Sequence, residues 1–167
     1  MNEQLIANGG VQYVPQIAAE QQIIYLDFDG ELTSYNGEIL TIENVTVQDS
    51  TLSRERIENI LAELNAKYSA QNVLFVTERP AAGEYSTIYV GKTDSFAPHG
   101  NFAGLAETID IHNQNRSDNA FVILDSAVAD EKIIATISHE ADHLLGTLDH
   151  GGEGLNAYAE IEVFPGV

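Results

Sequence analysis

Twelve residues near the carboxyl end organise the chain: His139-Glu140-Ala141-Asp142-His143-Leu144-Leu145-Gly146-Thr147-Leu148-Asp149-His150. On a helix, two histidines four positions apart project from one face and lie about one turn from each other. Both imidazoles can therefore bind a single metal ion. Glu140 follows the first histidine and can reach a water that such an ion holds. Glycine adopts the left-handed backbone conformation without steric cost, so Gly146 predicts that the helix ends there and that the chain turns back.

The residues after this glycine extend the pattern. Asp149 is a candidate third ligand, and the whole string is H-E-x-x-H-x-x-G-x-x-D. The string resembles the metzincin clan of zinc endopeptidases, and its Asp-His ending is similar to that of the snapalysin-type enzymes. The resemblance implies that His139, His143 and Asp149 bind Zn²⁺. It also implies that Glu140 is the general base. His150, one residue after Asp149, is the alternative third ligand.

This resemblance implies a zinc-dependent endopeptidase that acts on a protein or peptide substrate. A water held by zinc would attack the scissile carbonyl while Glu140 removes its proton and passes it to the leaving amine. Two features depart from the metzincin pattern. The clan usually has a small residue at the position of Asp142, and it takes its name from a methionine beneath the zinc, whereas the only methionine here is Met1. The alternative is therefore a metzincin-like binding domain with little or no activity.

Hydrophobic periodicity predicts the elements that precede the motif helix. Strands are expected at residues 22–28, 39–47, 73–76, 85–90, 105–111 and 120–124. A helix is expected at residues 54–68, and Asp130 is the expected N-cap of the motif helix, whose histidine side should face a cleft. The predicted fold class is α+β, in which a twisted mixed sheet packs against two main helices. The resemblance implies that the strand at 105–111 is an antiparallel edge strand that binds substrate backbone.

Length and composition indicate a single domain spanning residues 1–167, with residues 1–20 as a loose lead-in. A chain of this length, 44% hydrophobic, can bury a sizeable core. Its net charge of −19 argues against nucleic acid as a partner, because nucleic acid needs a basic face. No apolar run is long enough to cross a bilayer, so membrane insertion is not expected.

The amino-terminal segment and the absence of cysteine bear on localisation. Residues 1–10 show no basic segment followed by an apolar one, so no signal peptide is read in this chain. Because cysteine is absent, disulfides and thiolate metal sites are excluded. We expect a secreted or cell-surface bacterial protein from which any signal peptide has been removed.

A rival motif follows the first predicted strand. Asp27-Phe28-Asp29-Gly30 resembles the first motif of haloacid-dehalogenase-type phosphatases, in which Asp27 would be the nucleophile and Asp29 the acid-base partner. That chemistry also needs a downstream lysine followed by an acidic pair, and no such combination occurs here. An aspartate-glycine turn is the favoured interpretation, and a loop that binds Ca²⁺ is a further alternative.

A second metal site is conceivable beside the predicted edge strand. Asp94, His99, Asp110 and His112 resemble in position the structural metal site of matrixin-type relatives. Isolated surface histidines are the simpler interpretation of this loosely spaced set.

Overall fold

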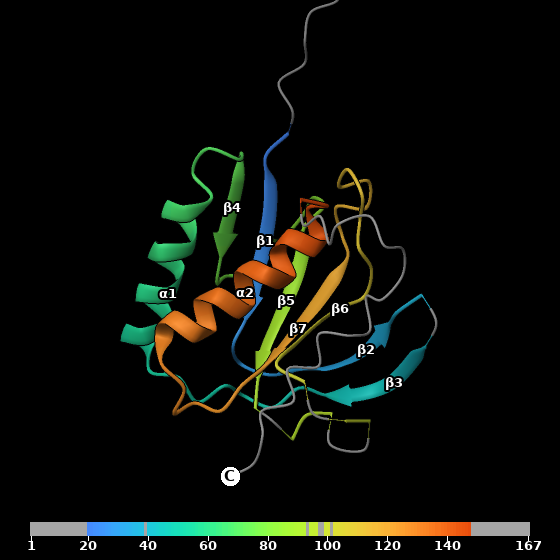
Figure 1. The fold of residues 1–167 in the computed structure, drawn as a ribbon, viewed down its shortest axis with the longest axis vertical. Coiled ribbons are helices and arrows are strands. Elements are labelled where there is room, and N and C mark those ends of the chain that lie inside the picture. The colour runs from blue at the N-terminus through green and yellow to red at the C-terminus, as the bar shows by residue number, and fades with distance from the viewer. Residues whose placement is uncertain (1–19, 39, 93, 97–98, 101, 148–167) are drawn as a thin grey trace, which may run out of the picture.

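The computed structural model describes residues 20–38, 40–92, 94–96, 99–100 and 102–147. Its centre is a five-stranded sheet in which the strands lie in the order β4-β1-β5-β7-β6 (Figure 1). These strands are β1 (Gln22–Asp27), β4 (Val73–Val76), β5 (Ser86–Gly91), β6 (Gly104–Ala106) and β7 (Asn119–Ile123). Strands β4, β1, β5 and β7 are parallel, and β6 pairs antiparallel with β7 at one edge. The predicted mixed sheet with an antiparallel edge strand is confirmed.

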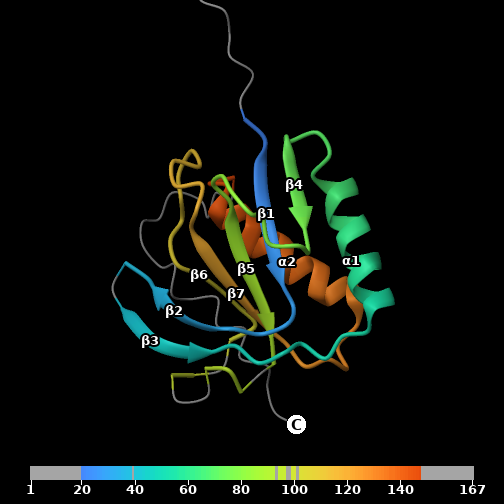
Figure 2. The same ribbon diagram turned by 180° about the vertical axis from the view of Figure 1, so that it is seen from behind.

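Two helices, α1 (Arg54–Lys67) and α2 (Asp130–Leu144), cover one face of this sheet (Figures 1 and 2). Helix α1 packs against β4, whereas α2 crosses the sheet and contacts β5, β6 and β7. The motif helix is therefore placed over the antiparallel edge strand. Within the part of the chain that the structure describes, no helix has both the length and the apolar character needed to cross a membrane.

The amino-terminal ends of the two helices are built differently. Ser53 caps α1, because its side chain accepts a hydrogen bond from the backbone N–H of Arg56. Helix α2 has Ala129 as its N-cap, so the prediction of Asp130 at that position was wrong by one residue. The carboxylate of Asp130 lies instead in the first turn, 2.6 Å from the guanidinium of Arg56. A side chain from α1 therefore fixes the beginning of the motif helix.

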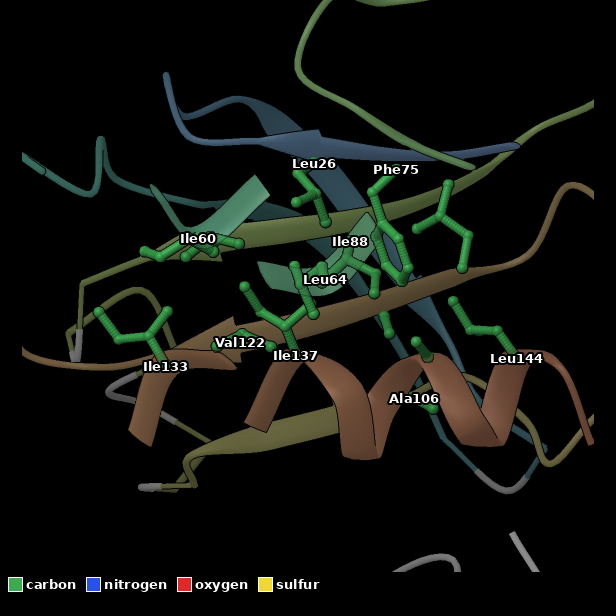
Figure 3. Close-up of a cluster of buried hydrophobic side chains, with 14 of the residues drawn as sticks. Leu26, Ile60, Leu64, Phe75, Ile88, Ala106, Val122, Ile133, Ile137 and Leu144 are labelled. Atoms are coloured by element: carbon green, nitrogen blue, oxygen red, sulfur yellow. The ribbon is translucent and has the colours of Figure 1, made fainter. Parts of the chain in front are cut away.

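Alternate residues of the sheet strands point toward the helices and form the main core (Figure 3). This core contains fully or almost fully buried aliphatic side chains from both helices and three strands: Leu26, Ile60, Leu64, Ile88, Val122, Ile133, Ile137 and Leu144. The intervening residues of β5 and β7 are also buried, because the opposite face of the sheet is covered as well. This explains the continuous apolar runs of the central strands.

The opposite face is covered by a separate antiparallel pair, β2 (Leu32–Asn36) and β3 (Thr41–Thr46). A second core joins this pair to the sheet through buried aromatic and aliphatic side chains: Tyr35, Ile42, Val45, Tyr89, Phe96 and Phe121. Strand β3 lies within the strand predicted at 39–47, whereas β2 was not predicted.

The edge strand is shorter than the sequence suggested. Strand β6 ends at Ala106, so the prediction of a strand at 105–111 was wrong beyond its first residues. The carboxylate of Glu107 accepts hydrogen bonds from the backbone N–H groups of Asn36 and Asn119, so its side chain takes the N–H that the backbone carbonyl of a continuing strand would accept. Left-handed backbone at His112 (φ 71°) and Asn113 (φ 49°) then reverses the direction of the chain.

Candidate metal and catalytic site

Helix α2 brings the two motif histidines together. The Nε2 atoms of His139 and His143 lie 3.1 Å apart, and the two rings are nearly perpendicular at 87°. Two nitrogens at 2.0–2.1 Å from a tetrahedral zinc ion would be about 3.3 Å apart. The two imidazoles therefore have the separation that two ligands of one zinc ion require.

The candidate base, Glu140, lies between α2 and the edge strand. Its side chain is only 4% exposed. A Cβ atom added to Gly104 would lie 2.0 Å from Oε1 and 2.7 Å from Cδ of Glu140. The first residue of β6 must therefore lack a side chain for the carboxylate to occupy this place.

The histidine side of α2 was expected to face a cleft. In the structure Glu140, His143 and Thr136 are buried, and His139 is half-buried. The expectation of an open side was therefore wrong for three of these four residues. The reason lies in the packing of α2 directly on the edge strand β6.

The end of α2 follows the prediction made from Gly146. This residue is left-handed, with φ +63°, and its N–H donates to the carbonyl of His143 at 3.1 Å. The N–H of Thr147 donates to the carbonyl of Asp142 at 3.0 Å. These two bonds together form a Schellman motif, which satisfies carbonyls that the helix leaves without partners. The chain therefore leaves the helix at Gly146, three residues after the second histidine.

The loop after β6 packs against this helix end. The N–H of Asp110 donates to the carbonyl of His143 at 3.1 Å. A Cβ atom on Gly146 would lie 2.2 Å from the carbonyl oxygen of Asp110. Gly146 thus serves two purposes, since it supplies the left-handed turn and allows the loop to approach.

Asp149, the predicted third ligand, lies outside the described residues, as do its alternative His150 and the segment 151–158. Asp149 as a zinc ligand therefore stays a prediction. Among the residues that the structure describes, no three His, Asp or Glu side chains gather where they could hold a metal ion. The described part of the site consists of two imidazoles with a carboxylate on the same helix.

Asp142, the residue that departs from the metzincin pattern, has a partner on the other helix. The single hydroxyl proton of Tyr68 is shared between two acceptors, Oδ1 of Asp142 at 2.7 Å and the carbonyl of Ser138 at 3.0 Å. Burial, together with the hydrogen bond to the Asp142 carboxylate, raises the pKa of Tyr68 well above its usual value. Nothing in the sequence indicated this pair, whose members are 74 residues apart.

The candidate second metal site is not assembled. Asp94, His99, Asp110 and His112 all lie in the described part of the chain, where no group of three potential ligands comes together. Both histidines are exposed, as the simpler interpretation expected.

Asp27 closes a turn at the end of β1. Its Oδ1 accepts hydrogen bonds from the backbone N–H groups of Asp29 and Gly30, and Gly30 is left-handed with φ +85°. Its Oδ2 lies 3.3 Å from the guanidinium of Arg79. The carboxylate is almost completely buried, and burial raises its pKa. These contacts favour the aspartate-glycine turn over a nucleophile or a calcium loop.

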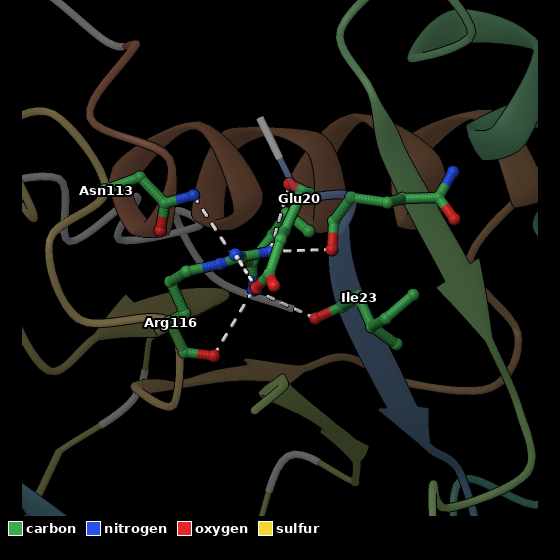
Figure 4. Close-up of polar contacts among 6 residues, drawn as sticks. Glu20, Ile23, Asn113 and Arg116 are labelled. Atoms are coloured by element: carbon green, nitrogen blue, oxygen red, sulfur yellow. Dashed lines mark hydrogen bonds and ion pairs between the residues drawn. The ribbon is translucent and has the colours of Figure 1, made fainter. Parts of the chain in front are cut away.

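A polar network that sequence patterns did not reveal ties the loop between β6 and β7 to the start of β1. The guanidinium of Arg116 donates to the side chain of Gln22 at 2.9 Å and to the backbone carbonyl of Gln21 at 2.6 Å, and pairs with Glu20 (Figure 4). The amide of Asn113 donates to the same Gln22 oxygen at 3.2 Å. These contacts fix the loop that packs against the end of α2.

The network continues into the sheet at Asp118. Gln22 donates to the hydroxyl of Ser86, which donates to Oδ1 of Asp118 at 2.5 Å. Oδ2 of Asp118 is buried and has no hydrogen-bond partner among the described residues. Burial is the main cause that raises the pKa of Asp118 to about 6.

Comparisons of this chain with protein-family models, with curated proteins and with solved structures find no match.

Proposed function

We propose that this chain is a zinc-dependent endopeptidase. The observation that carries the proposal is the 3.1 Å separation between the Nε2 atoms of His139 and His143, which suits two ligands of one zinc ion. Glu140 lies on the same helix between them in sequence, which is the H-E-x-x-H arrangement of zinc peptidases. Asp149 is proposed as the third ligand, with His150 as the alternative.

The proposed reaction assigns one task to each part of the site. When bound, Zn²⁺ acts as a Lewis acid that polarises the scissile carbonyl and makes water more acidic. The carboxylate of Glu140 takes a proton from the attacking water and returns it to the leaving amine. The outer edge of β6 offers backbone groups to which an extended substrate can add as a further strand. The proposed substrate is therefore a protein or peptide.

Metal content and one substitution test this proposal. Protein purified without added metal should contain about one zinc ion per chain by mass spectrometry. Glu140→Gln should keep this zinc and lose hydrolysis of casein. Glu131→Gln serves as the control, because Glu131 is an exposed carboxylate in the first turn of the same helix. The base is wrongly assigned if Glu140→Gln digests casein at the wild-type rate.

The third ligand is tested by the same measurement. Asp149→Ala should lower the zinc content, whereas His150→Ala should leave it unchanged. The reverse result would assign the position to His150. Retention of zinc by both variants would contradict a three-ligand site completed by either residue.

A second candidate function is a metzincin-like binding domain with little or no activity. One observation favours it: Glu140 and His143 are both more than nine-tenths buried. A peptide could then bind along β6 without reaching the base. A mixed peptide library separates the two functions, because an endopeptidase releases new amino termini and a binding domain does not.

A further inference from the structure

The hydroxyl of Tyr68 contacts the residue that precedes each motif histidine. Tyr68 is the C-cap of α1 and is completely buried. Its hydroxyl bonds the carbonyl of Ser138 and the carboxylate of Asp142, at 3.0 Å and 2.7 Å. Ser138 precedes His139, and Asp142 precedes His143. One hydroxyl thus ties two successive turns of α2 at the level of the two imidazoles.

The tyrosine itself is held in place from several sides. Its ring packs on Phe75 of β4, with ring centroids 5.1 Å apart. Its backbone N–H donates to the carbonyl of Leu64, and its carbonyl accepts from Gln71. The hydroxyl therefore has a fixed position relative to the sheet, and the contact ties α2 to that position.

Apolar packing restrains the rotation of a helix about its axis less sharply than directional hydrogen bonds do, and the polar contacts of Arg56 and Asp110 lie at the two ends of α2. The end of a helical side chain lies about 5–6 Å from the axis, so a rotation of about 10° moves an imidazole nitrogen by ~1 Å. Metal–ligand distances, in contrast, tolerate deviations of only about 0.2 Å. Two hydrogen bonds one turn apart prevent this rotation, because turning the helix lengthens both of them.

The same carboxylate also reaches the chain that leaves the helix. The hydroxyl of Thr147 donates to Oδ1 of Asp142 at 3.2 Å, in addition to the backbone bond between these two residues. Thr147 stands two positions before Asp149 in the sequence. Contacts from Tyr68 thus extend through Asp142 to the point from which the proposed third ligand follows.

We propose that Tyr68 is a positioning residue of the metal site, whose hydroxyl sets the rotation of α2 at which the Nε2 atoms of His139 and His143 converge. This inference rests on the proposed function, since it requires that the two histidines bind zinc. It also accounts for Asp142, because only a residue with a side-chain acceptor at this position can complete the contact.

Zinc affinity of the full chain, measured by competition with a chelator, tests the inference. Tyr68→Phe removes both hydroxyl bonds and should weaken zinc binding about tenfold, as loss of supporting contacts around metal sites does. Tyr89→Phe is the matched control, because its buried hydroxyl accepts a bond from Thr33 on the other face of the sheet. Both variants should lower the urea midpoint of unfolding to a similar extent. Only Tyr68→Phe should lower zinc affinity.

Substitutions of Asp142 provide a second route that does not depend on the tyrosine. Asp142→Ala should weaken zinc about as much as Tyr68→Phe, and the double variant should be no weaker than either single variant. Asp142→Asn keeps an acceptor for the hydroxyl and should retain affinity close to that of the wild type. The absorption spectrum of the Co²⁺-loaded protein should change in Tyr68→Phe and in Asp142→Ala. It should remain that of the wild type in Asp142→Asn and Tyr89→Phe.

The outcomes separate this inference from the proposed function. A wild-type chain that binds no zinc would overturn the proposed function and this inference with it. Zinc binding by the wild type with equal affinities in Tyr68→Phe and Tyr89→Phe would overturn the positioning role alone. Additive losses in the double variant would show that Tyr68 and Asp142 act separately, which also contradicts the inference.

Discussion

The missing side chain of Gly104 leaves the space that the carboxylate of Glu140 occupies. A Cβ atom at Gly104 would overlap Oε1 and Cδ, at 2.0 Å and 2.7 Å, and would touch Cγ at 3.0 Å. Gly104 begins the antiparallel edge strand, and it pairs with Val122 of β7. The position of the candidate base is therefore set by a glycine on a different element, 36 residues earlier in the chain.

Gly104→Ala should displace this carboxylate and reduce hydrolysis. The added methyl group meets the end of a flexible side chain, so we expect a loss of stability of only about 1 kcal/mol. A misplacement of about 1 Å in a catalytic group can cost roughly 100-fold in rate, so the loss of casein hydrolysis should be much larger. The zinc content should remain that of the wild type, because the three atoms nearest to this methyl group all belong to Glu140.

A double-substitution cycle shows whether Glu140 is what the methyl group meets. Gly104→Ala should lower the free energy of unfolding in the wild-type background and leave it nearly unchanged in a Glu140→Ala background. Urea unfolding of the four proteins measures this difference. An equal loss in both backgrounds would mean that the alanine clashes with another part of the structure.

Gly146→Ala should be far more damaging than the same substitution at another glycine with positive φ. Gly146 and Gly83 both have positive φ, at +63° and +93°. A Cβ atom at Gly83 has nothing within 4 Å, whereas at Gly146 it meets the backbone of Asp110, His112 and Ile111. We expect Gly83→Ala to cost about 1 kcal/mol and Gly146→Ala about 3 kcal/mol or more. Thermal or urea unfolding of both variants checks this; equal losses would show that backbone strain alone explains the glycine.

How far the sequence determines this site depends on the distance between the residues involved. The spacing of His139 and His143 was sufficient to predict their convergence, because the helix itself sets that geometry. Gly146 was equally predictable, because left-handed helix ends favour glycine. The contacts of Glu140 with Gly104 and of Asp142 with Tyr68 could not be predicted, because they depend on how distant elements pack.

The same limit applies to the fold. Strand β4, Val73–Val76, was predicted with its exact bounds, and β1, β5 and β7 to within one residue at each end, because short apolar runs of this kind are typical of buried strands. Strand β2 lacks such a run, because only one of its five residues is buried. Its extended conformation is stabilised by pairing with β3. The edge strand ends where the carboxylate of Glu107 bonds to the N–H groups of Asn119 in β7 and Asn36 in β2, and β2 is a strand that the sequence did not reveal.

Arg56 should be important for stability, and its neighbour Arg54 should not. Arg56 donates to the carboxylate of Asp130 and to the carbonyls of Ser126 and Val128, so it holds the start of the motif helix. Arg54 pairs with Glu58 on the surface, where its side chain is 92% exposed. Arg56→Met should cost about 2 kcal/mol, since charged hydrogen bonds to partly buried groups are lost.

Arg54→Met should leave the urea midpoint unchanged, because solvent and salt screen an exposed ion pair. The two substitutions remove the same charge from the same helix, so a general effect of net charge would appear in both. Equal midpoints for Arg56→Met and Arg54→Met would show that the contacts of Arg56 do not stabilise the fold.

Asp118 should make the protein less stable at neutral pH than under mildly acidic conditions. Its pKa is raised from 3.8 to about 6, mainly by burial, with the nearby carboxylates of Asp110 and Glu107 acting in the same direction. A carboxyl group with a higher pKa in the folded state binds its proton more tightly there than in the unfolded chain. Stability from this group is therefore present at low pH and is lost as the pH rises through about 6.

Asp118→Asn removes this titration while keeping an oxygen that can accept the hydrogen bond from Ser86. The free energy of unfolding of the wild type should fall by about 1 kcal/mol relative to Asp118→Asn between pH 5 and pH 7.5. Urea unfolding of both proteins at the two pH values measures the change. Titration of carboxylates distant from Asp118 affects both proteins alike, so it cancels in the comparison. A difference between the two proteins that stays constant from pH 5 to pH 7.5 would mean that Asp118 does not change its protonation in this range, which would contradict a pKa near 6.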